Sequence, residues 1–599
     1  MESRSRADQH PDQHPDQHPD QHPDQHPDQH PDQHPDQHPD QRPGRQLAEG
    51  FVERYAALDP IGATFEGIPG HDHELTDYSP DGRAERLAHI RSTLRELSSL
   101  RLADDAERVA AESLRYFLET DEDLAEAGED LRALRVIGSP VSEIRLCFDL
   151  MARATEHDWE TLTARVALVP QAIGGFIDTL REGTGKGLFA APRQAVACAR
   201  QADAFAGIGG ESPAFFRGLA DELDASDLDV GALRSRLHTV ATGATAAYAS
   251  LGRFLVEEYL PVTTASDAVG AERYRRFARA FNGTVLDLDE TYAWGWEELA
   301  RIEQSMASVA ERILPGQPMP AVIEHLEHDH TRVIEGEDAL RAWLQDLIDR
   351  TFDELDGTHF DIPDEIRRCE AMISPPGGAA AMYYTGPSED FSRPGRTWYP
   401  TQGRTTFPLW GEVSTCYHEA VPGHHLQIAT TRHLHDRLDR FQRTIGWNSG
   451  YGEGWALYAE RLMGELGYLD DPAFELGMLR AQAMRAMRVV VDIGLHLELP
   501  IPAGERSHPG EVWTPELALP FVLEHSYHPE DFMKSEVDRY LGWPGQAISY
   551  KVGERVWLRA RDAARKRAGS AFDLKGFHTA ALELGPLGLD QLEAELGRL

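Results

Sequence analysis

Cysteine is scarce in this chain of 599 residues, and its four copies lie far apart. They are Cys147, Cys198, Cys369 and Cys416, and no two of them form a Cys-x-x-Cys pair. A framework of disulfide bonds is therefore excluded as the source of stability. Reduced thiols in a cytosolic protein are the expectation.

Long apolar runs are also missing. A membrane-spanning helix needs about 20 apolar residues in succession. The nearest stretch, from Val489 to Leu499, contains Asp492, His496 and Glu498. The start of the chain has no apolar segment of the kind that signal peptides carry. These absences predict a protein that stays in the cytoplasm and has no membrane partner.

Basic residues are outnumbered by acidic ones. Lys and Arg total 59 and Asp and Glu total 100, so the formal charge is 59 − 100 = −41. Nucleic acids and anionic membrane surfaces both require a basic binding face. Neither is expected as the main partner of this chain.

A tandem repeat occupies the N-terminus. Residues 8–39 are eight copies of Asp-Gln-His-Pro, and residues 40–43 form a degenerate ninth copy with Arg42 in place of the histidine. Proline at every fourth position prevents a helix, and the repeat offers nothing apolar to bury. Residues 1–45 are therefore predicted to be a disordered tail. Its histidines could bind metal weakly, or the tail could be a repeat expansion without a function.

The remainder of the chain, residues 46–599, has the apolar spacing of helices. Apolar residues recur every three or four positions, and Ala, Leu, Glu and Arg dominate. Strand-like runs are confined to the section between Pro363 and Pro408, and examples are Ala381–Tyr384 and Thr397–Tyr399. No linker divides this region. We expect one large, mainly α domain with a small β-sheet beside the most informative motif. The clearest helical stretches are Phe51–Leu58, Ala84–Leu100, Arg108–Leu118, Leu233–Leu260, Tyr274–Ile313, Leu340–Phe352, Val552–Lys566 and Phe577–Leu596, the last of them interrupted at Gly585-Pro586.

The most informative motif is His418-Glu419-Ala-Val-Pro422-Gly-His424-His425. It begins like the zinc motif HExxH, in which two histidines four residues apart bind the metal and the Glu acts on a water at the metal. Pro422 stands where the second histidine belongs. On a regular helix His425 would lie about 10.5 Å along the axis from His418, and His424 would point to another side. A bulge at Pro422-Gly would allow His424 to act as the second ligand, so we favour His424 and keep His425 as the alternative.

A third ligand is expected on a following helix. The sequence Glu453-Gly-Trp-Ala-Leu-Tyr-Ala-Glu460 places two acids seven residues apart, on one helix face. We predict that Glu453 binds the metal and that Glu460 orients a histidine ring. Both could instead be solvated surface acids.

These motifs resemble the DUF885 family of bacterial proteins, which is similar to the helical, gluzincin-like zinc metallopeptidases. The resemblance runs from about Leu47 to the C-terminus and leaves out the repeat. It rests on five ordered motifs. They are SRPG (392–395), HEAVPGHHLQ (418–427), EGWALYAE (453–460), VDIGLH (491–496) and SEVDRYLGWPGQAISYKVG (535–553). It implies a bilobed helical fold with a deep cleft and one Zn²⁺ per chain.

Five further residues enter through this resemblance. Helical oligopeptidases use a late Tyr to donate a hydrogen bond to the oxyanion, and Tyr550 is similar in position, with Tyr540 as its rival. Arg539 and Arg393 are candidates to bind a substrate carboxylate, although either could be paired within the protein. His496, in the fourth motif, is expected to face the cleft.

The motifs and the family resemblance together predict a zinc-dependent peptidase that hydrolyses short peptides. Zn²⁺ would be held by His418, His424 and Glu453, with Glu419 as the general base. The backbone of residues 378–399 could align the peptide as an added strand. The alternative is a metal- or peptide-binding protein without turnover.

Overall fold

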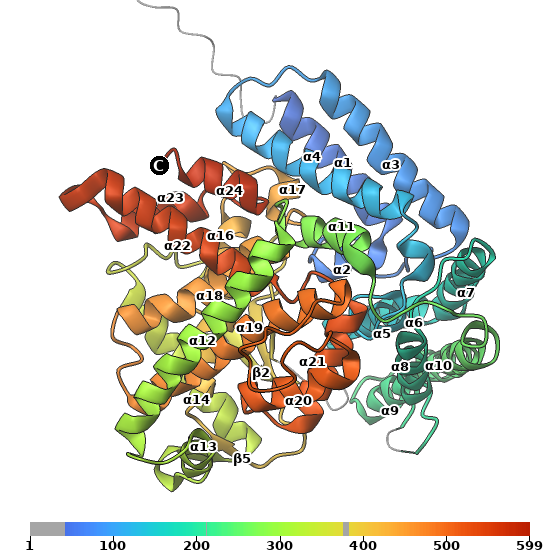
Figure 1. Ribbon diagram of the computed structural model, residues 1–599. Coiled ribbons are helices and arrows are strands. Elements are labelled where there is room, and N and C mark those ends of the chain that lie inside the picture. The colour runs from blue at the N-terminus through green and yellow to red at the C-terminus, as the bar shows by residue number, and fades with distance from the viewer. Residues whose placement is uncertain (1–41, 211–212, 375–381) are drawn as a thin grey trace, which may run out of the picture.

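The structure, a computed structural model, describes residues 42–210, 213–374 and 382–599 (Figure 1). The predicted disordered tail lies outside these residues as far as position 41. Its predicted end at residue 45 is wrong, because helix α1 (Pro43–Leu58) already begins at the last proline of the degenerate repeat. Proline suits the first turn of a helix, since its missing N–H would have no partner there.

The chain is mainly helical, as predicted, and its first half forms a group of helices at the top and right of Figure 1. A π-helical turn, Leu255–Tyr259, extends α10. Residues between Ile61 and Tyr259 form one hydrophobic cluster, and α1 to α4 contribute a smaller one with Phe441 and Ile445. The other helices here are α2 (Pro60–Phe65), α3 (Pro80–Ser99), α4 (Asp105–Glu126), α5 (Pro140–Leu146), α6 (Glu156–Val166), α7 (Val169–Gly185), α8 (Pro192–Phe205), α9 (Phe215–Ala225) and α10 (Gly231–Phe254).

The second half builds the largest hydrophobic cluster, in which α12 packs along α19 and α18 along α22. The predicted helix Tyr274–Ile313 is divided in two, because Gly283 has a positive φ of 65° and ends α11. The helices are α11 (Gly270–Asn282), α12 (Leu288–Ile313), α13 (Met319–Glu327), α14 (Glu337–Leu355), α15 (Glu412–Glu419), α16 (His424–His433), α17 (Arg440–Arg443), α18 (Ser449–Glu465), α19 (Pro472–Leu497), α20 (Pro515–Ser526), α21 (Glu530–Gly542), α22 (Ser549–Ala568), α23 (Leu574–Leu582) and α24 (Leu589–Leu596).

Two small sheets lie just before α15, and all of their strands except Val333–Glu335 fall in the predicted section, so the expectation that strands are confined to residues 363–408 is wrong for that one strand. One has the strand order β2-β4-β3, in which β4 (Gly395–Tyr399) is parallel to β2 (Cys369–Ile373) and antiparallel to β3 (Tyr383–Thr385). The other pairs β1 (Val333–Glu335) with β5 (Thr406–Pro408). The expected extended run at Ala381–Tyr384 corresponds to β3, although Ala381 itself lies outside the described residues.

Candidate metal centre

The His-Glu motif lies where one helix stops and another starts. Helix α15 ends at Glu419 and α16 begins at His424, with a turn between them. A side chain on Gly423 would place its Cβ only 1.9 Å from the His418 carbonyl oxygen, so glycine is required for this close return of the chain. The prediction that a regular helix cannot run through Pro422 is confirmed, and the irregularity is a complete break between two helices.

The break brings three side chains together. The Nε2 atoms of His418 and His424 each lie 3.4 Å from Oε2 of Glu453. One ligand atom from each residue lies within 4.8 Å of the others, and all three residues are buried. The cluster therefore draws on both sides of the break and on α18.

Its spacing fits a zinc ion. Donor atoms bound at about 2.0–2.1 Å to a tetrahedral Zn²⁺ lie about 3.4 Å from one another. Both measured N–O separations agree with that value. Within the described part of the chain, the buried Oε2 of Glu453 has no hydrogen-bond partner. Such an atom costs free energy unless something pairs with it, and a cation between the two imidazoles and this carboxylate would do so.

The charges around the cluster favour a cation. Burial raises the pKa of Glu453, but the adjacent imidazoles of His424 and His418 outweigh burial and hold that pKa well below its usual range. Burial and the charge of Arg485 lower the pKa of His418, yet the adjacent carboxylates of Glu453 and Glu460 raise it to about 9. The acids thus stabilise positive charge at this position.

Glu460 lies behind His418, as predicted. Its Oε1 is 2.8 Å from Nδ1 of His418, and its Oε2 accepts a hydrogen bond of 2.5 Å from Ser414. Arg485 approaches the same carboxylate at 3.4 Å. When Glu460 accepts a hydrogen bond from Nδ1–H, the free lone pair of the His418 ring is on Nε2. Nε2 is the atom that faces Glu453.

His425 points away from the cluster. Its Nδ1 is 2.9 Å from the Tyr384 hydroxyl and its Nε2 is 2.6 Å from the Ile366 carbonyl oxygen. Burial lowers its pKa to about 4. Because both ring nitrogens are engaged, the alternative in which His425 is the second ligand is wrong for this structure.

Glu419 is buried and lines the same cavity as the cluster. Burial is the main cause that raises the pKa of its carboxyl group above the usual value, while the imidazoles of His418 and His424 oppose the rise. A raised pKa favours proton uptake, which a general base requires.

Tyr550 stands beside the cluster. Its ring lies 6.2 Å from that of His418 with 19° between the planes, and it lines the cavity. It reaches this place because α22 crosses α18 closely, where a Cβ on Gly454 would come within 2.5 Å of Gly553. Burial raises the pKa of Tyr550, so its hydroxyl stays protonated.

The rival, Tyr540, is fully buried, and its hydroxyl is held by other side chains. This hydroxyl donates to Glu536 at 2.8 Å and accepts from Nε of Arg488 at 3.2 Å. Tyr540 is not among the residues that line the cavity. Its predicted role as an oxyanion donor is therefore not supported by its position.

Three other predicted residues have structural partners. The prediction that His496 faces the cleft is wrong, because this side chain does not line the cavity and is buried with Nε2 3.0 Å from the Tyr540 carbonyl oxygen. Arg393 lies outside the cavity lining and donates to the Gly386 carbonyl oxygen at 3.4 Å. Arg539 does line the cavity, but two of its nitrogens bind Glu536 and the third binds Gln546.

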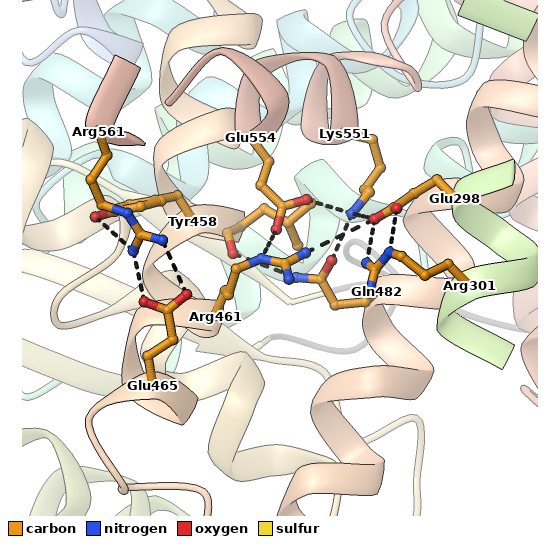
Figure 2. A network of polar contacts seen from close by, with 10 residues as sticks. Glu298, Arg301, Tyr458, Arg461, Glu465, Gln482, Lys551, Glu554 and Arg561 are labelled. Carbon is orange, nitrogen blue, oxygen red and sulfur yellow. Dashed lines mark hydrogen bonds and ion pairs between the residues drawn. The ribbon is translucent and has the colours of Figure 1, made fainter. Parts of the chain in front are cut away.

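A buried polar network braces the helices that carry the cluster (Figure 2). Lys551, next to Tyr550 on α22, contacts Glu298 at 2.8 Å, Gln482 at 2.9 Å and also Glu554. Arg461 on α18 donates to Glu554 at 2.7 Å. None of these residues lines the cavity. The network joins α12, α18, α19 and α22 behind the site, which fixes the positions of Glu453 and Tyr550.

The cluster opens into a cavity of about 1680 Å³ between the two halves of the chain. The first half contributes aromatic side chains such as Tyr116, Phe117 and Phe205, and the second contributes the metal cluster and β3. Pockets for drug-sized ligands measure about 300–1,000 Å³. The cavity therefore has room for a larger ligand, such as a peptide of several residues.

Sequence reasoning missed three residues of the site, and one of them carried a usable signal. Ser414 lies one helical turn before His418. Arg485 lies one turn before Arg488 on α19. Tyr384 belongs to β3 and meets His425 only in the folded chain.

Comparison with known proteins identifies a family and a fold. A family model described as "Bacterial protein of unknown function (DUF885)" matches residues 60–596. The search of curated proteins returned no match. Two solved structures are similar. One is of "the putative lipoprotein from Colwellia psychrerythraea", with a TM-score of 0.80 and 24% identity over 93% of this chain and 99% of that chain. The other is of "a putative lipoprotein of unknown function from Shewanella oneidensis", with a TM-score of 0.67 and 17% identity over 92% and 99%.

The two solved structures share the fold of this chain at these levels of identity. None of the helices in the described ranges has the length and apolar character that crossing a bilayer requires.

Proposed function

The chain belongs to the DUF885 family of bacterial proteins of unknown function, and we propose that it is a zinc-dependent peptidase that hydrolyses short peptides. The observation that carries this proposal is the pair of 3.4 Å distances from Glu453 to His418 and His424. They set three buried donors at the spacing of a zinc site. The adjoining cavity supplies the space for a peptide.

His418, His424 and Glu453 would hold the ion. A bound Zn²⁺ supplies Lewis-acid chemistry, since it polarises the scissile carbonyl and makes water a stronger nucleophile near neutral pH. Glu419 accepts the proton of the attacking water and passes it to the leaving amine. Glu460 keeps His418 in the tautomer that binds metal through Nε2.

The peptide has a strand to pair with. β3 (Tyr383–Thr385) lies at one edge of its sheet, and all three of its residues line the cavity. An extended peptide could add to this edge through main-chain hydrogen bonds. β3 belongs to the 378–399 section that was expected to align the substrate, of which residues 382–399 are described.

Changing Tyr550 to Phe tests the oxyanion role. If the hydroxyl donates a hydrogen bond in the transition state, kcat should fall by about 10²–10³-fold, with KM changing far less. Steady-state kinetics on one cleaved peptide measures both constants. Tyr540→Phe is the matched control and should affect thermal stability more than kcat, because its hydroxyl bonds to Arg488 and Glu536. The reverse pattern would assign the role to Tyr540.

Zinc content and peptide products together test the whole proposal. The chain without residues 1–41 keeps α1 and loses the histidine-rich repeat, and it should retain about one zinc ion per molecule by elemental analysis. Mass spectrometry of a mixed peptide pool should show products that disappear with a chelator and return with zinc.

Two results would favour other functions. Zinc that is lost together with the repeat would indicate a metal-binding tail. Zinc that is retained without any product would support the alternative of a metal- or peptide-binding protein without turnover. Location in the cytoplasm remains part of the proposal, since the word lipoprotein describes only the two solved relatives.

A further inference from the structure

One wall of the cavity carries three buried arginines, Arg485 and Arg488 on α19 and Arg539 on α21. The carboxylates that pair with them are Glu460, bound to Arg485, and Glu536, shared by the other two. Three guanidinium groups thus face two carboxylates. The wall retains one positive charge beyond what its own acids neutralise.

The arginines differ in which nitrogens are occupied. Every guanidinium nitrogen of Arg539 has a partner. Arg488 uses Nε for the Tyr540 hydroxyl and Nη2 for Glu536, and its Nη1 is buried with no hydrogen-bond partner in the described chain. Nε of Arg485 is likewise buried with no hydrogen-bond partner among the described residues. Buried charged donors without partners are costly, so this wall is built to receive an anion.

The open donors lie next to the metal cluster. The guanidinium carbon of Arg488 is 4.6 Å from the centre of the Tyr550 ring, and that of Arg485 is 5.7 Å from it. The same Tyr550 ring stacks on His418 at 6.2 Å. An anion held here would therefore lie within one or two peptide residues of a bond cleaved at the cluster.

We propose that Arg488, assisted by Arg485, binds the C-terminal carboxylate of the peptide, so that the enzyme removes one or two residues from C-termini. This inference rests on the proposed peptidase function. Every unmodified peptide carries this carboxylate, whereas an acidic side chain would be present in only some substrates. Arg539, which the sequence suggested for the carboxylate, is saturated by Glu536 and Gln546.

The test compares peptides of one sequence that end in a free acid or in an amide. Binding to the zinc-loaded Glu419→Gln variant, measured by calorimetry, should be about 10–100-fold tighter for the acid. Mass spectrometry with the wild-type enzyme should show loss of C-terminal residues from the acid and little cleavage of the amide. Equal binding and equal cleavage of the two peptides would overturn the inference and leave the peptidase proposal intact. Tighter binding of the acid without cleavage by the wild type would overturn the peptidase proposal instead.

Two lysine substitutions test which arginine binds the C-terminal carboxylate. Arg488→Lys keeps a positive charge against Glu536, but its compact ammonium lacks the planar fork with which a guanidinium can bind two carboxylates at once, so the preference for the acid should fall to near one. Arg539→Lys, which has the same partner, should retain the preference. Thermal unfolding confirms that both variants fold. A third peptide ends in an amide and has Glu in place of Gln at the penultimate position, so its only carboxylate there is on a side chain. If this peptide binds more tightly than the free acid, the assignment to the C-terminal carboxylate is overturned.

Discussion

Replacing Glu419 with Gln is expected to lower peptide hydrolysis by at least about 10²–10⁴-fold, the usual contribution of a general base. Gln has nearly the same shape, so α15 and the three metal ligands should keep their places. Its amide oxygen cannot accept a proton from water, however. The measurement is kcat on a cleaved peptide together with the zinc content, which should stay near one ion per chain.

Glu412→Gln is the matched control for this variant. Glu412 lies at the start of the same helix, lines the same cavity, and has a pKa that burial raises to about 7. The charges that act on it are those of Arg404, Arg480 and Glu327 rather than of the metal cluster. Its variant should therefore keep most of the activity. Unchanged turnover in Glu419→Gln would refute the role of Glu419.

His424→Ala is expected to abolish stoichiometric zinc binding and the activity with it. Loss of a group that only orients a ligand weakens metal binding by about 10–100-fold. Loss of the ligand itself should weaken zinc binding by more than that. Competition with a chromophoric chelator measures the affinity. Because the change removes a side chain at the cavity surface, the thermal stability of the metal-free protein should change little.

The adjacent His425→Ala is the control and should show the opposite pattern. It leaves the three ligands in place, so zinc should stay bound. It removes the partner of the Tyr384 hydroxyl and of the Ile366 carbonyl oxygen, which should lower the free energy of unfolding by about 1–3 kcal/mol. Zinc lost from His425→Ala and kept by His424→Ala would reverse the assignment of the second ligand.

Much of the site could be predicted because helical geometry is local. Glu453 and Glu460 lie seven residues apart, which places both carboxylates on one face of α18 whatever surrounds it. The spacing of His418 from His424 and His425 showed by arithmetic alone that a regular helix cannot bring a second histidine to the metal. Family motifs then located Tyr550. Each of these inferences used residues within a few turns of one another or an ordered set of motifs.

The wrong predictions share one cause. Tyr540 and His496 were placed in the cleft because they belong to motifs, and motifs contain structural residues as well. Whether such a side chain faces a ligand depends on partners far along the chain. Tyr540 meets Arg488, 52 residues away, and His496 bonds to the carbonyl of Tyr540, 44 residues away. No local pattern encodes these pairings.

The sequence by itself determined that the body is helical, that an acidic chain carries a His-Glu motif broken by proline, and that acids on one later helix could complete a metal site. Periodicity and spacing are properties of neighbouring residues, so they can be read before folding. Only the tertiary structure decided that His424 turns toward Glu453, that His425 turns to the core, and that Arg488 rather than Arg539 keeps a free donor. Those outcomes depend on which distant groups each side chain meets once it is buried, since every buried polar atom takes whatever partner the packed helices bring within reach.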